Sequence, residues 1–361
     1  MAKLIANDVF LEQLIKTPEL VIDKLDLLYV YENHLKIQRS KNNKTFIYLL
    51  DGKPVDEGED LKRIKSLVIP PAWKNVKISL PKNGHLQAIG KDVKNRKQYR
   101  YHPLWVKIRS QTKFFKMIAF GKQLSKIRKQ VDKDLEQTKW TKSKVIALVI
   151  RLMEETHIRV GNEQYAKRNK TYGLTTLRNK HVSLEKNNLK FEFVGKKGKK
   201  HQITLRNKKL IRLVNRCEEI PGWELFQYYD SDGKKQRIDS GLVNEYLQNI
   251  TSDLFTAKDF RTWGATVIAF ETLKEKDLTF IDNVKNTNVI QAYDAVAKEL
   301  GNTRNVCKKY YVHPFVINSY LDGSIKKAFI EADTINNKQE YFSNTEIALL
   351  NLLKDYTPKF L

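Results

Sequence analysis

The spacing of hydrophobic positions separates a short N-terminal part of the chain from a longer remainder. Leu11, Leu14 and Ile15 recur at helical spacing, which predicts a short helical arm within residues 1–26. From residue 27 to residue 89, short β-rich runs alternate with the turn sequences KNNK, DGKP and PKNG. Such alternation is typical of strands joined by tight turns. We therefore expect a small β-rich domain after the arm.

The remainder of the chain has mainly helical periodicity. Apolar spacing predicts helices over residues 104–134, 142–158, 240–250, 259–273, 283–300 and 345–355. Residues 174–205 interrupt this pattern with a β-hairpin region whose tip is GKKGKK. The expected fold class is α+β. A β-rich N-terminal domain covers residues 1–105, and a larger, mainly α-helical domain that carries the hairpin covers residues 106–361.

The charge of the chain indicates an acidic partner. Sixty-six Lys and Arg residues stand against 41 Asp and Glu, which gives a net charge of +25 over 361 residues. A compact chain with such an excess repels itself unless a polyanion offsets the charge. Nucleic acid is favoured over a membrane surface, because the sequence has no run of eighteen apolar residues, signal peptide or basic amphipathic tail.

Cofactor signatures do not occur in the sequence. Cys217 and Cys307 lie far apart, which gives neither a disulfide framework nor a zinc site and fits a reducing compartment. The seven histidines show no paired metal-ligand spacing, and no GxxxxGK[ST] motif supports ATP use. We expect a cytoplasmic protein that uses no metal and no small-molecule cofactor.

Candidate chemistry centres on the segment LGNTRNVCKKYYVHP, which places Tyr310 and Tyr311 beside two lysines. A tyrosine can form an ester with a phosphate, but its pKa near 10 requires nearby cations that favour the phenolate. Taken alone, such a segment is more typical of a partly buried helix face. Phosphoryl chemistry needs cations from elsewhere in the chain.

Three other segments could supply those cations. Arg159 stands in RVGNEQY and Arg261 in KDFRTWGATV, and a guanidinium donates two hydrogen bonds to phosphate oxygens without losing its charge. Lys196 follows a glycine at the hairpin tip, and a lysine can protonate a departing sugar oxygen. Each residue alone is better explained as surface charge. The segment GKDVKNRKQYRYH mixes cations and tyrosines, which fits either nucleic-acid contacts or a basic hairpin over packed rings.

Taken together and in this order, these motifs resemble the type IB DNA topoisomerases, in particular the compact bacterial and poxvirus-like branch. IPPAW followed by GKDVKNRKQYRYH is similar to that family's N-terminal domain. The resemblance extends from residue 27 to residue 322. It implies a bilobed clamp that acts as a monomer on double-stranded DNA, in the cytoplasm at the nucleoid. Supercoils would be relaxed without ATP or metal by transient cleavage of one strand through a 3′-phosphotyrosyl link, followed by religation.

The resemblance also implies roles for individual residues. Tyr311 falls on the nucleophile, and Arg159 and Arg261 fall on the arginines that bind the scissile phosphate. Lys196 falls on the general acid for the 5′ oxygen. Asn302 stands where poxvirus and eukaryotic enzymes carry histidine, so that a neutral amide donor would replace an imidazole there.

Neighbouring residues receive lesser roles. Tyr310 is expected to pack, and His313 to cap or pack locally, because its family position is not catalytic. The residues that the resemblance places in contact with DNA are Gln98, Tyr99, Tyr101, Tyr165 and Lys197.

Two alternatives stay open. A tyrosine recombinase shares this chemistry, but it usually carries His-x-x-Arg at the second arginine, where this chain has Lys258, and its N-terminal domain is helical. A non-catalytic nucleic-acid clamp would explain the charge but not the ordered motifs.

Overall fold

The structure, a computed structural model, describes residues 8–43, 45–276, 281–337 and 339–358. The chain divides into two compact units, residues 1–116 with 357–361, and residues 117–356. This division falls later than the expected boundary after residue 105, because α3 (Pro103–Leu135) is one continuous helix. Its first turns belong to the first unit, since Trp105 and Ile108 are buried together with Leu11 and Leu14.

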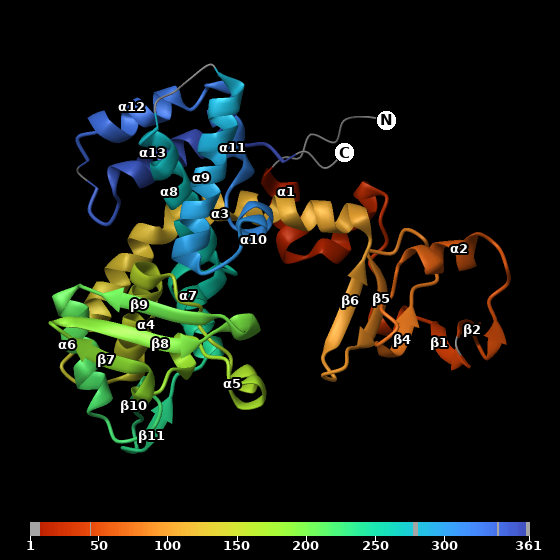
Figure 1. The fold of residues 1–361 in the computed structure, drawn as a ribbon, viewed down its shortest axis with the longest axis horizontal. Coiled ribbons are helices and arrows are strands. Elements are labelled where there is room, and N and C mark those ends of the chain that lie inside the picture. Colours follow the sequence, from red (N-terminus) through yellow and green to blue (C-terminus); the bar gives the residue numbers. More distant parts are fainter. Residues whose placement is uncertain (1–7, 44, 277–280, 338, 359–361) are drawn as a thin grey trace. The chain divides into compact units, whose positions relative to one another are not determined.

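The first unit is built on an antiparallel six-stranded sheet, in the order β3-β2-β1-β4-β5-β6. The expected β-rich domain and helical arm are both confirmed (Figure 1). Ile37, Val76, Ile78 and Ala88 of the sheet are buried together with Ile64 of α2. The elements are α1 (Asp8–Lys16), η1 (Pro18–Leu20), η2 (Ile22–Leu25), η3 (Glu32–His34), β1 (Ile37–Asn42), β2 (Thr45–Leu50), β3 (Lys53–Pro54), α2 (Glu59–Ser66), β4 (Lys74–Ile78), β5 (Leu86–Lys91) and β6 (Lys97–Tyr101).

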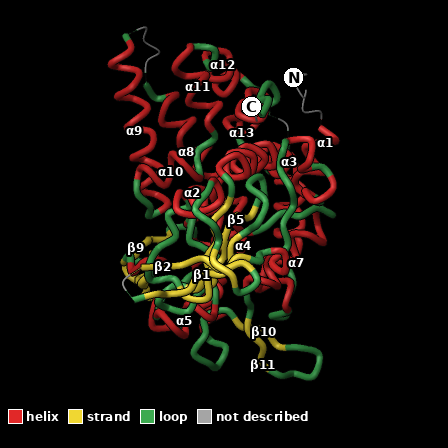
Figure 2. The backbone as a smooth tube through the Cα atoms, turned by 90° about the vertical axis from the view of Figure 1, so that its right-hand side faces the viewer, coloured by secondary structure: helices red, strands yellow, loops and turns green. Residues whose placement is uncertain are grey.

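The second unit is mainly helical and carries two small antiparallel sheets (Figures 1 and 2). The predicted hairpin of β8 (Asn188–Val194) and β9 (Lys200–Leu205) is part of a three-stranded sheet. Its third strand, Val182–Glu185, pairs with the edge of β8 opposite β9. The helices are α4 (Lys142–Thr156), α5 (Glu163–Asn169), α6 (Lys208–Glu218), α7 (Ser240–Thr251), α8 (Ala257–Lys274), α9 (Asp282–Leu300), α10 (Arg304–Tyr310), α11 (Pro314–Asp322), α12 (Lys326–Thr334) and α13 (Asn344–Leu353). The other elements are η4 (Leu174–Thr176), η5 (Asn179–His181), η6 (Lys196–Gly198), β7 (Val182–Glu185), β8 (Asn188–Val194), β9 (Lys200–Leu205), β10 (Gln227–Tyr229) and β11 (Lys235–Arg237).

Helix α4 forms the centre of the second unit. Every residue from Val145 to Ile150 is buried, so the helix is covered on all sides. The Thr141 hydroxyl caps its N-terminus by accepting a hydrogen bond from the Lys144 amide at 3.2 Å. His157 ends the helix in the left-handed region (φ 52°), and the following residues lead into the RVGNEQY segment. A rigid central helix therefore fixes where Arg159 leaves the core.

A buried ionic network ties the C-terminal helix α13 to the rest of this unit. Arg128 of α3 makes two hydrogen bonds of 2.8 Å to the Glu346 carboxylate and one of 2.9 Å to Glu154. The Trp263 indole donates to the same Glu346 carboxylate at 2.9 Å. Burial alone would raise the pKa of Glu346, but Arg128 outweighs it and holds that pKa below its usual value. Glu346 therefore stays ionised inside the protein.

Removing Glu346 should destabilise the protein strongly, because Arg128 would remain buried without its main partner. We expect Glu346→Ala to lower the free energy of unfolding by roughly 3–5 kcal/mol. Urea denaturation of both proteins measures the difference, and Glu136→Ala, at an exposed position just after α3, is the control. The difference in free energy of unfolding between the wild type and Glu346→Ala should be fully present above about pH 4.3. It should shrink as the pH falls through the depressed pKa of Glu346. An equal loss in both variants would contradict this account.

Candidate active site

Tyr311 stands at a chain turn that is anchored to helix α8. It directly follows α10, and its amide donates to the Cys307 carbonyl at 3.0 Å. The buried Thr266 hydroxyl donates to the Tyr311 carbonyl at 3.4 Å and accepts from the His313 amide at 3.1 Å. His313 is buried and caps α11 by accepting from the Phe315 amide at 3.1 Å. The expected local capping role of His313 is thus confirmed.

The neighbouring Tyr310 is less buried than the expected packing role implies. Its side chain is 49% exposed, and the Lys309 ammonium lies 5.4 Å from its ring centroid. Tyr311, in contrast, is partly buried against the main core. The helix ends at Tyr310 and the backbone changes direction, so the two adjacent rings face different surroundings.

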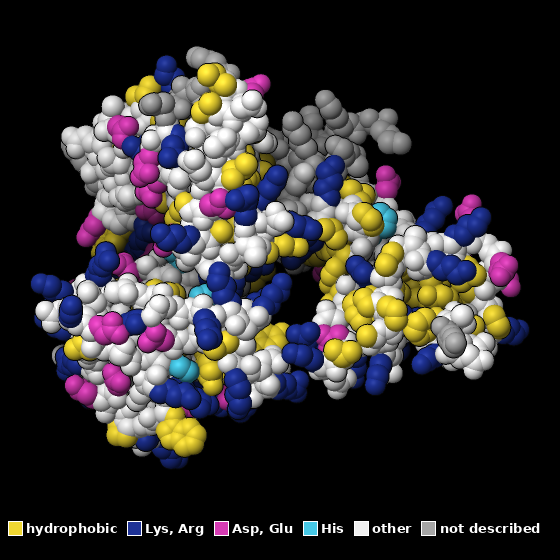
Figure 3. All heavy atoms as spheres, in the orientation of Figure 1, with side chains coloured by type: hydrophobic (Ala, Val, Ile, Leu, Met, Phe, Trp, Pro, Cys, Tyr) yellow, Lys and Arg dark blue, Asp and Glu magenta, His cyan; other side chains and the backbone are white. Residues whose placement is uncertain are grey.

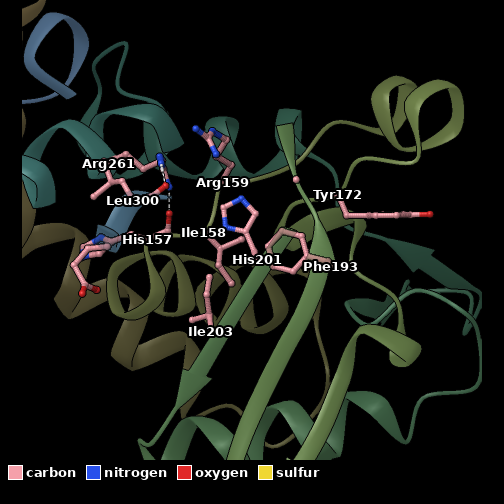
Figure 4. A pocket seen from close by; sticks show the side chains of 11 residues that line it. His157, Ile158, Arg159, Tyr172, Phe193, His201, Ile203, Arg261 and Leu300 are labelled. Atoms are coloured by element: carbon pink, nitrogen blue, oxygen red, sulfur yellow. Dashed lines mark hydrogen bonds between the residues drawn. The ribbon is translucent and has the colours of Figure 1, made fainter. Parts of the chain in front are cut away.

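Arg261 is buried and joins the ends of two other helices to α8. Its Nη1 donates to the carbonyl of His157 at the end of α4, and its Nη2 donates to the carbonyl of Leu300, the last residue of α9, at 2.8 Å (Figure 4). Both carbonyls lie at helix C-termini, where backbone acceptors lack helical partners and carry partial negative charge. Burial, followed by the charge of Arg159, lowers the pKa of Arg261 to about 10, so the guanidinium stays charged at neutral pH.

A close approach of two backbone segments holds Arg159. The Arg159 carbonyl accepts from the Leu174 amide at 2.9 Å, and the Val160 carbonyl accepts from the Thr175 amide at 2.7 Å. A Cβ on Gly173 would lie only 2.5 Å from the Arg159 carbonyl oxygen, so glycine is required there. The Arg159 side chain in turn donates to Asn302 Oδ1 at 2.6 Å. The structure thereby brings Arg159 and Asn302 together.

The two arginines act on the Tyr311 phenol. The Arg261 guanidinium carbon lies 5.4 Å from the Tyr311 ring centroid. Burial by itself would raise the pKa of Tyr311, but the charges of Arg261 and Arg159 outweigh it and hold that pKa below its usual value. Four of the expected site residues, Tyr311, Arg159, Arg261 and Asn302, therefore converge although they are distant in sequence.

Two buried donors in this cluster point to an anion. Arg261 Nε and Asn302 Nδ2 are buried, and neither finds an acceptor among the residues that the structure describes. Unpaired buried donors are costly in a folded protein, so such groups call for an explanation beyond packing. Both belong to residues that also contact neighbours through their other atoms. Buried, positively charged or neutral N–H donors of this kind are the groups that bind phosphate oxygens.

Lys196 lies at the tip between β8 and β9, where its side chain is exposed. Lys197 at the same tip is exposed and adopts the left-handed region (φ 65°). Lys199 is the tip lysine whose charge reaches the site, since it contributes to lowering the pKa of His201. The structure therefore places Lys196 at the hairpin tip, directly after Gly195, which lines the same pocket as Arg159 and Arg261.

The expected DNA-contacting residues of the first unit lie on both faces of β6. Tyr99 and Tyr101 are exposed and stack at 5.8 Å between ring centroids, with the Lys97 ammonium 5.7 Å from the Tyr99 ring. Gln98 points to the opposite face, where its amide donates to Asp92 at 3.1 Å. The tyrosines form a surface suited to a sugar or base, whereas Gln98 is occupied locally.

Tyr165 lies in the first turn of α5 in the second unit and is exposed. The Asn162 side chain caps this helix by accepting from the Tyr165 amide at 3.2 Å. Figure 3 shows many Lys and Arg side chains, in dark blue, over the visible face of the unit that carries α5 and the hairpin. The predicted basic surface is therefore present beside this helix.

Two histidines that sequence reasoning missed, His157 and His201, line the pocket beside Arg159 and Arg261 (Figure 4). Burial and nearby cations lower the pKa of His157 and of His201 to about 4, so both rings are neutral at neutral pH. His157 ends α4, and a Cβ on Gly264 would lie 2.7 Å from its ring. Glycines in other segments approach both imidazole rings. A single sequence does not show which glycine would lie against which histidine, so these contacts could not be predicted.

Two family models match the chain. Residues 102–338 match the catalytic core of eukaryotic DNA topoisomerase I, and residues 45–92 match the N-terminal domain of bacterial DNA topoisomerase IB. The class indicated by both units is thus that of a DNA topoisomerase.

Similar proteins agree with these matches. DNA topoisomerase 1B of Acanthamoeba polyphaga mimivirus is 34% identical over 299 residues, which cover 80% of this chain and 89% of that protein. DNA topoisomerase 1 of Rabbit fibroma virus (strain Kasza) is 29% identical over 276 residues, covering 72% and 81%. DNA topoisomerase 1B of Vaccinia virus (strain Copenhagen) is 21% identical over 264 residues, covering 71% and 77%.

The chain belongs to the type IB DNA topoisomerase family. It is a DNA topoisomerase type I, an enzyme that relaxes supercoiled DNA. A solved structure of XerH site-specific recombinase bound to a palindromic difH substrate also matches, over 53% of this chain and 48% of that chain, with 17% identity and a TM-score of 0.34. That score is too low to carry an argument, and the family match decides against the recombinase and non-catalytic alternatives.

Among the residues that the structure describes, no group of three or more His, Cys, Asp and Glu side chains is arranged to hold a metal ion. Within the same ranges, no helix is both long and apolar enough to cross a membrane.

Removing either arginine should raise the pKa of the Tyr311 phenol, because a positive charge that favours the phenolate disappears. The prediction is tested by NMR titration of tyrosine labelled at Cζ, with Tyr311→Phe identifying the signal. Arg261→Ala and Arg159→Ala should shift the titration to higher pH. Arg304→Ala is the control, because this exposed arginine of α10 pairs with Asp294 at 2.6 Å. An unchanged Tyr311 titration in Arg261→Ala would contradict the assignment.

Proposed function

We propose that this topoisomerase uses Tyr311 to cleave one strand of double-stranded DNA and reseals it without ATP or a metal ion. The observation that carries the proposal is the convergence of Arg159 and Arg261 on the Tyr311 phenol. Their charges favour the phenolate, which is the nucleophilic form of tyrosine. The match to the topoisomerase I catalytic core over this part of the chain supports it.

Cleavage begins with attack of the Tyr311 oxygen on the phosphorus of one backbone phosphodiester. A bond forms between the tyrosine oxygen and phosphorus, and the bond from phosphorus to the 5′ oxygen of the next nucleotide breaks. The products are a 3′-phosphotyrosyl link and a free 5′-hydroxyl end. Because the new ester replaces the old one, no external energy source is needed for the reverse step.

Arg159, Arg261 and Asn302 stabilise the charge that develops on the non-bridging oxygens. The buried Arg261 Nε and Asn302 Nδ2 are the donors available for this role. Fixed donors in a water-poor site are worth more than the same groups in water, because they need no reorganisation during the reaction. Asn302 can donate to an oxygen as the family histidine would, but it cannot carry a proton.

Lys196 protonates the departing 5′ oxygen. An alkoxide is a poor leaving group, so a proton donor on this side of the phosphorus accelerates the step. The exposed position of Lys196 at the hairpin tip leaves it accessible to a bound strand. After cleavage the free end swivels and releases supercoils of either sign. The 5′ hydroxyl then attacks the phosphotyrosyl link and restores both the strand and Tyr311.

Each unit offers its own surface for the duplex. In the first unit, Tyr99 and Tyr101 form an exposed stacked pair. In the second unit, Tyr165 on α5 and Lys197 at the hairpin tip are exposed. Phosphate contacts from such a basic surface make binding depend steeply on salt. We propose further that the enzyme acts as a monomer on double-stranded DNA at the nucleoid, and Gln98 would join the contacts only after releasing Asp92.

Relaxation of a supercoiled plasmid in EDTA, without ATP, tests the proposed function. The wild type and Tyr310→Phe should both relax the plasmid, because the attacking oxygen belongs to Tyr311, beside the two arginines. Tyr311→Phe should bind the plasmid but leave it supercoiled, since it lacks the attacking oxygen. Gel electrophoresis over time measures the three rates. Relaxation by Tyr311→Phe, or relaxation by the wild type only after a divalent metal is restored, would refute the proposal.

A further inference from the structure

His201 is held tightly between two glycines that belong to different parts of the active site. A Cβ on Gly195 would lie 2.6 Å from the imidazole Nε2, and a Cβ on Gly301 would lie 2.5 Å from its Cε1. Both distances are far below van der Waals contact, so only glycine backbone can approach the ring on these two sides. A third side is covered by Phe193, whose ring stacks on the imidazole at 5.0 Å between centroids and 14° between planes.

The two glycines immediately precede residues with proposed catalytic roles. Gly195 is buried, caps η6 and directly precedes Lys196. Gly301 ends α9 with φ +60° and directly precedes Asn302, whose side-chain oxygen accepts from Arg159. The imidazole therefore fills the space between the backbone that carries the proton donor and the backbone that carries the phosphate-binding amide.

The charge state of the ring fits this location. Burial first, and then the charges of Arg159, Lys199 and Arg261, lower the pKa of His201 to about 4. The ring is therefore neutral when the enzyme works and adds no repulsion to the two arginines. Figure 4 shows the imidazole between Arg159 and the Phe193 ring, on the pocket side of β9. The main-chain carbonyl of Lys199 accepts from the Gly195 amide at 2.7 Å and closes the tip just before His201.

We infer that His201 is a positioning residue that sets the hairpin tip, and with it Lys196, in register with the phosphate-binding residues at the end of α9. This inference rests on the proposed role of Lys196 as the proton donor. A proton donor must reach within hydrogen-bond distance of its acceptor, and displacement by about 1 Å can cost on the order of 10²-fold in rate. Replacing the imidazole with a smaller group removes the side chain that fills the space between Gly195 and Gly301. The position of the hairpin tip relative to the end of α9 is then no longer fixed.

A substrate that does not need a proton donor separates this role from a general structural one. A duplex oligonucleotide whose scissile phosphate carries sulfur in place of the 5′ bridging oxygen releases a thiolate. A thiolate leaves without protonation because thiols are far more acidic than alcohols. Single-turnover cleavage of the oxygen and sulfur duplexes is compared for each variant, and the ratio of the two rates is the readout. A partly unfolded variant loses both rates equally, so its ratio does not move.

His201→Ala should cleave the oxygen duplex about 10–10²-fold more slowly than the wild type and the sulfur duplex at close to the wild-type rate. Lys196→Ala should show the same rescue. Arg261→Ala should lose about 10²–10³-fold on both duplexes, because its role at the non-bridging oxygens does not depend on the leaving group. His181→Ala is the matched control, since the pKa of His181 is also lowered to about 4, but its ring packs on Tyr172, 4.4 Å between centroids. Its ratio should equal that of the wild type.

The outcomes distinguish two failures. If sulfur does not rescue Lys196→Ala, the proposed role of Lys196 is wrong, and the inference falls with it. If sulfur rescues Lys196→Ala but not His201→Ala, or if His201→Ala cleaves the oxygen duplex at the wild-type rate, only the role of His201 is wrong. Should His201→Ala fail to fold, His201→Gln is measured on the same two duplexes, and the same ratio decides.

Discussion

The burial of a guanidinium charge beside a phenol is the constraint on which this active site depends. Arg261 is removed from water, and its charge is balanced by the terminal carbonyls of two helices, those of His157 and Leu300. A charge in such surroundings acts more strongly on a neighbouring group than it would at the surface. The ends of α4 and α9 must therefore meet at α8, and Tyr311 must lie within reach of the same point.

Residues near the C-terminal end of the chain pack against the neighbours of Arg261 and Tyr311. Glu346 binds the indole of Trp263, two residues after Arg261, and the Tyr356 ring packs edge-on against His313, two residues after Tyr311, at 4.5 Å. Both supporting residues lie beyond residues 102–338, which match the catalytic core of eukaryotic topoisomerase I. The segment after Gly323, for which the sequence indicated no purpose, thus stabilises the two elements that carry the reactive groups.

Local patterns predicted the elements, and ordered motifs predicted which residues would meet. The long helices and the β-rich first unit followed from periodicity, because short-range packing determines them. The partial exposure of Tyr310 and the third strand beside the hairpin did not follow, since each depends on a chain turn or on pairing between segments. The contact of His201 with Gly301 joins residues a hundred positions apart, and the pairing of Arg128 with Glu346 spans 218. Such contacts leave no local signal in one sequence.

The most direct test of the central claim is to identify the amino acid and the DNA end that become linked. Enzyme and duplex are denatured during turnover, digested with protease and nuclease, and the nucleotide-bearing peptide is sequenced by tandem mass spectrometry. The account predicts a 3′-phosphoryl nucleotide on Tyr311 and none on the adjacent Tyr310. A nucleotide on Tyr310, or a link through a 5′ phosphate, would contradict it.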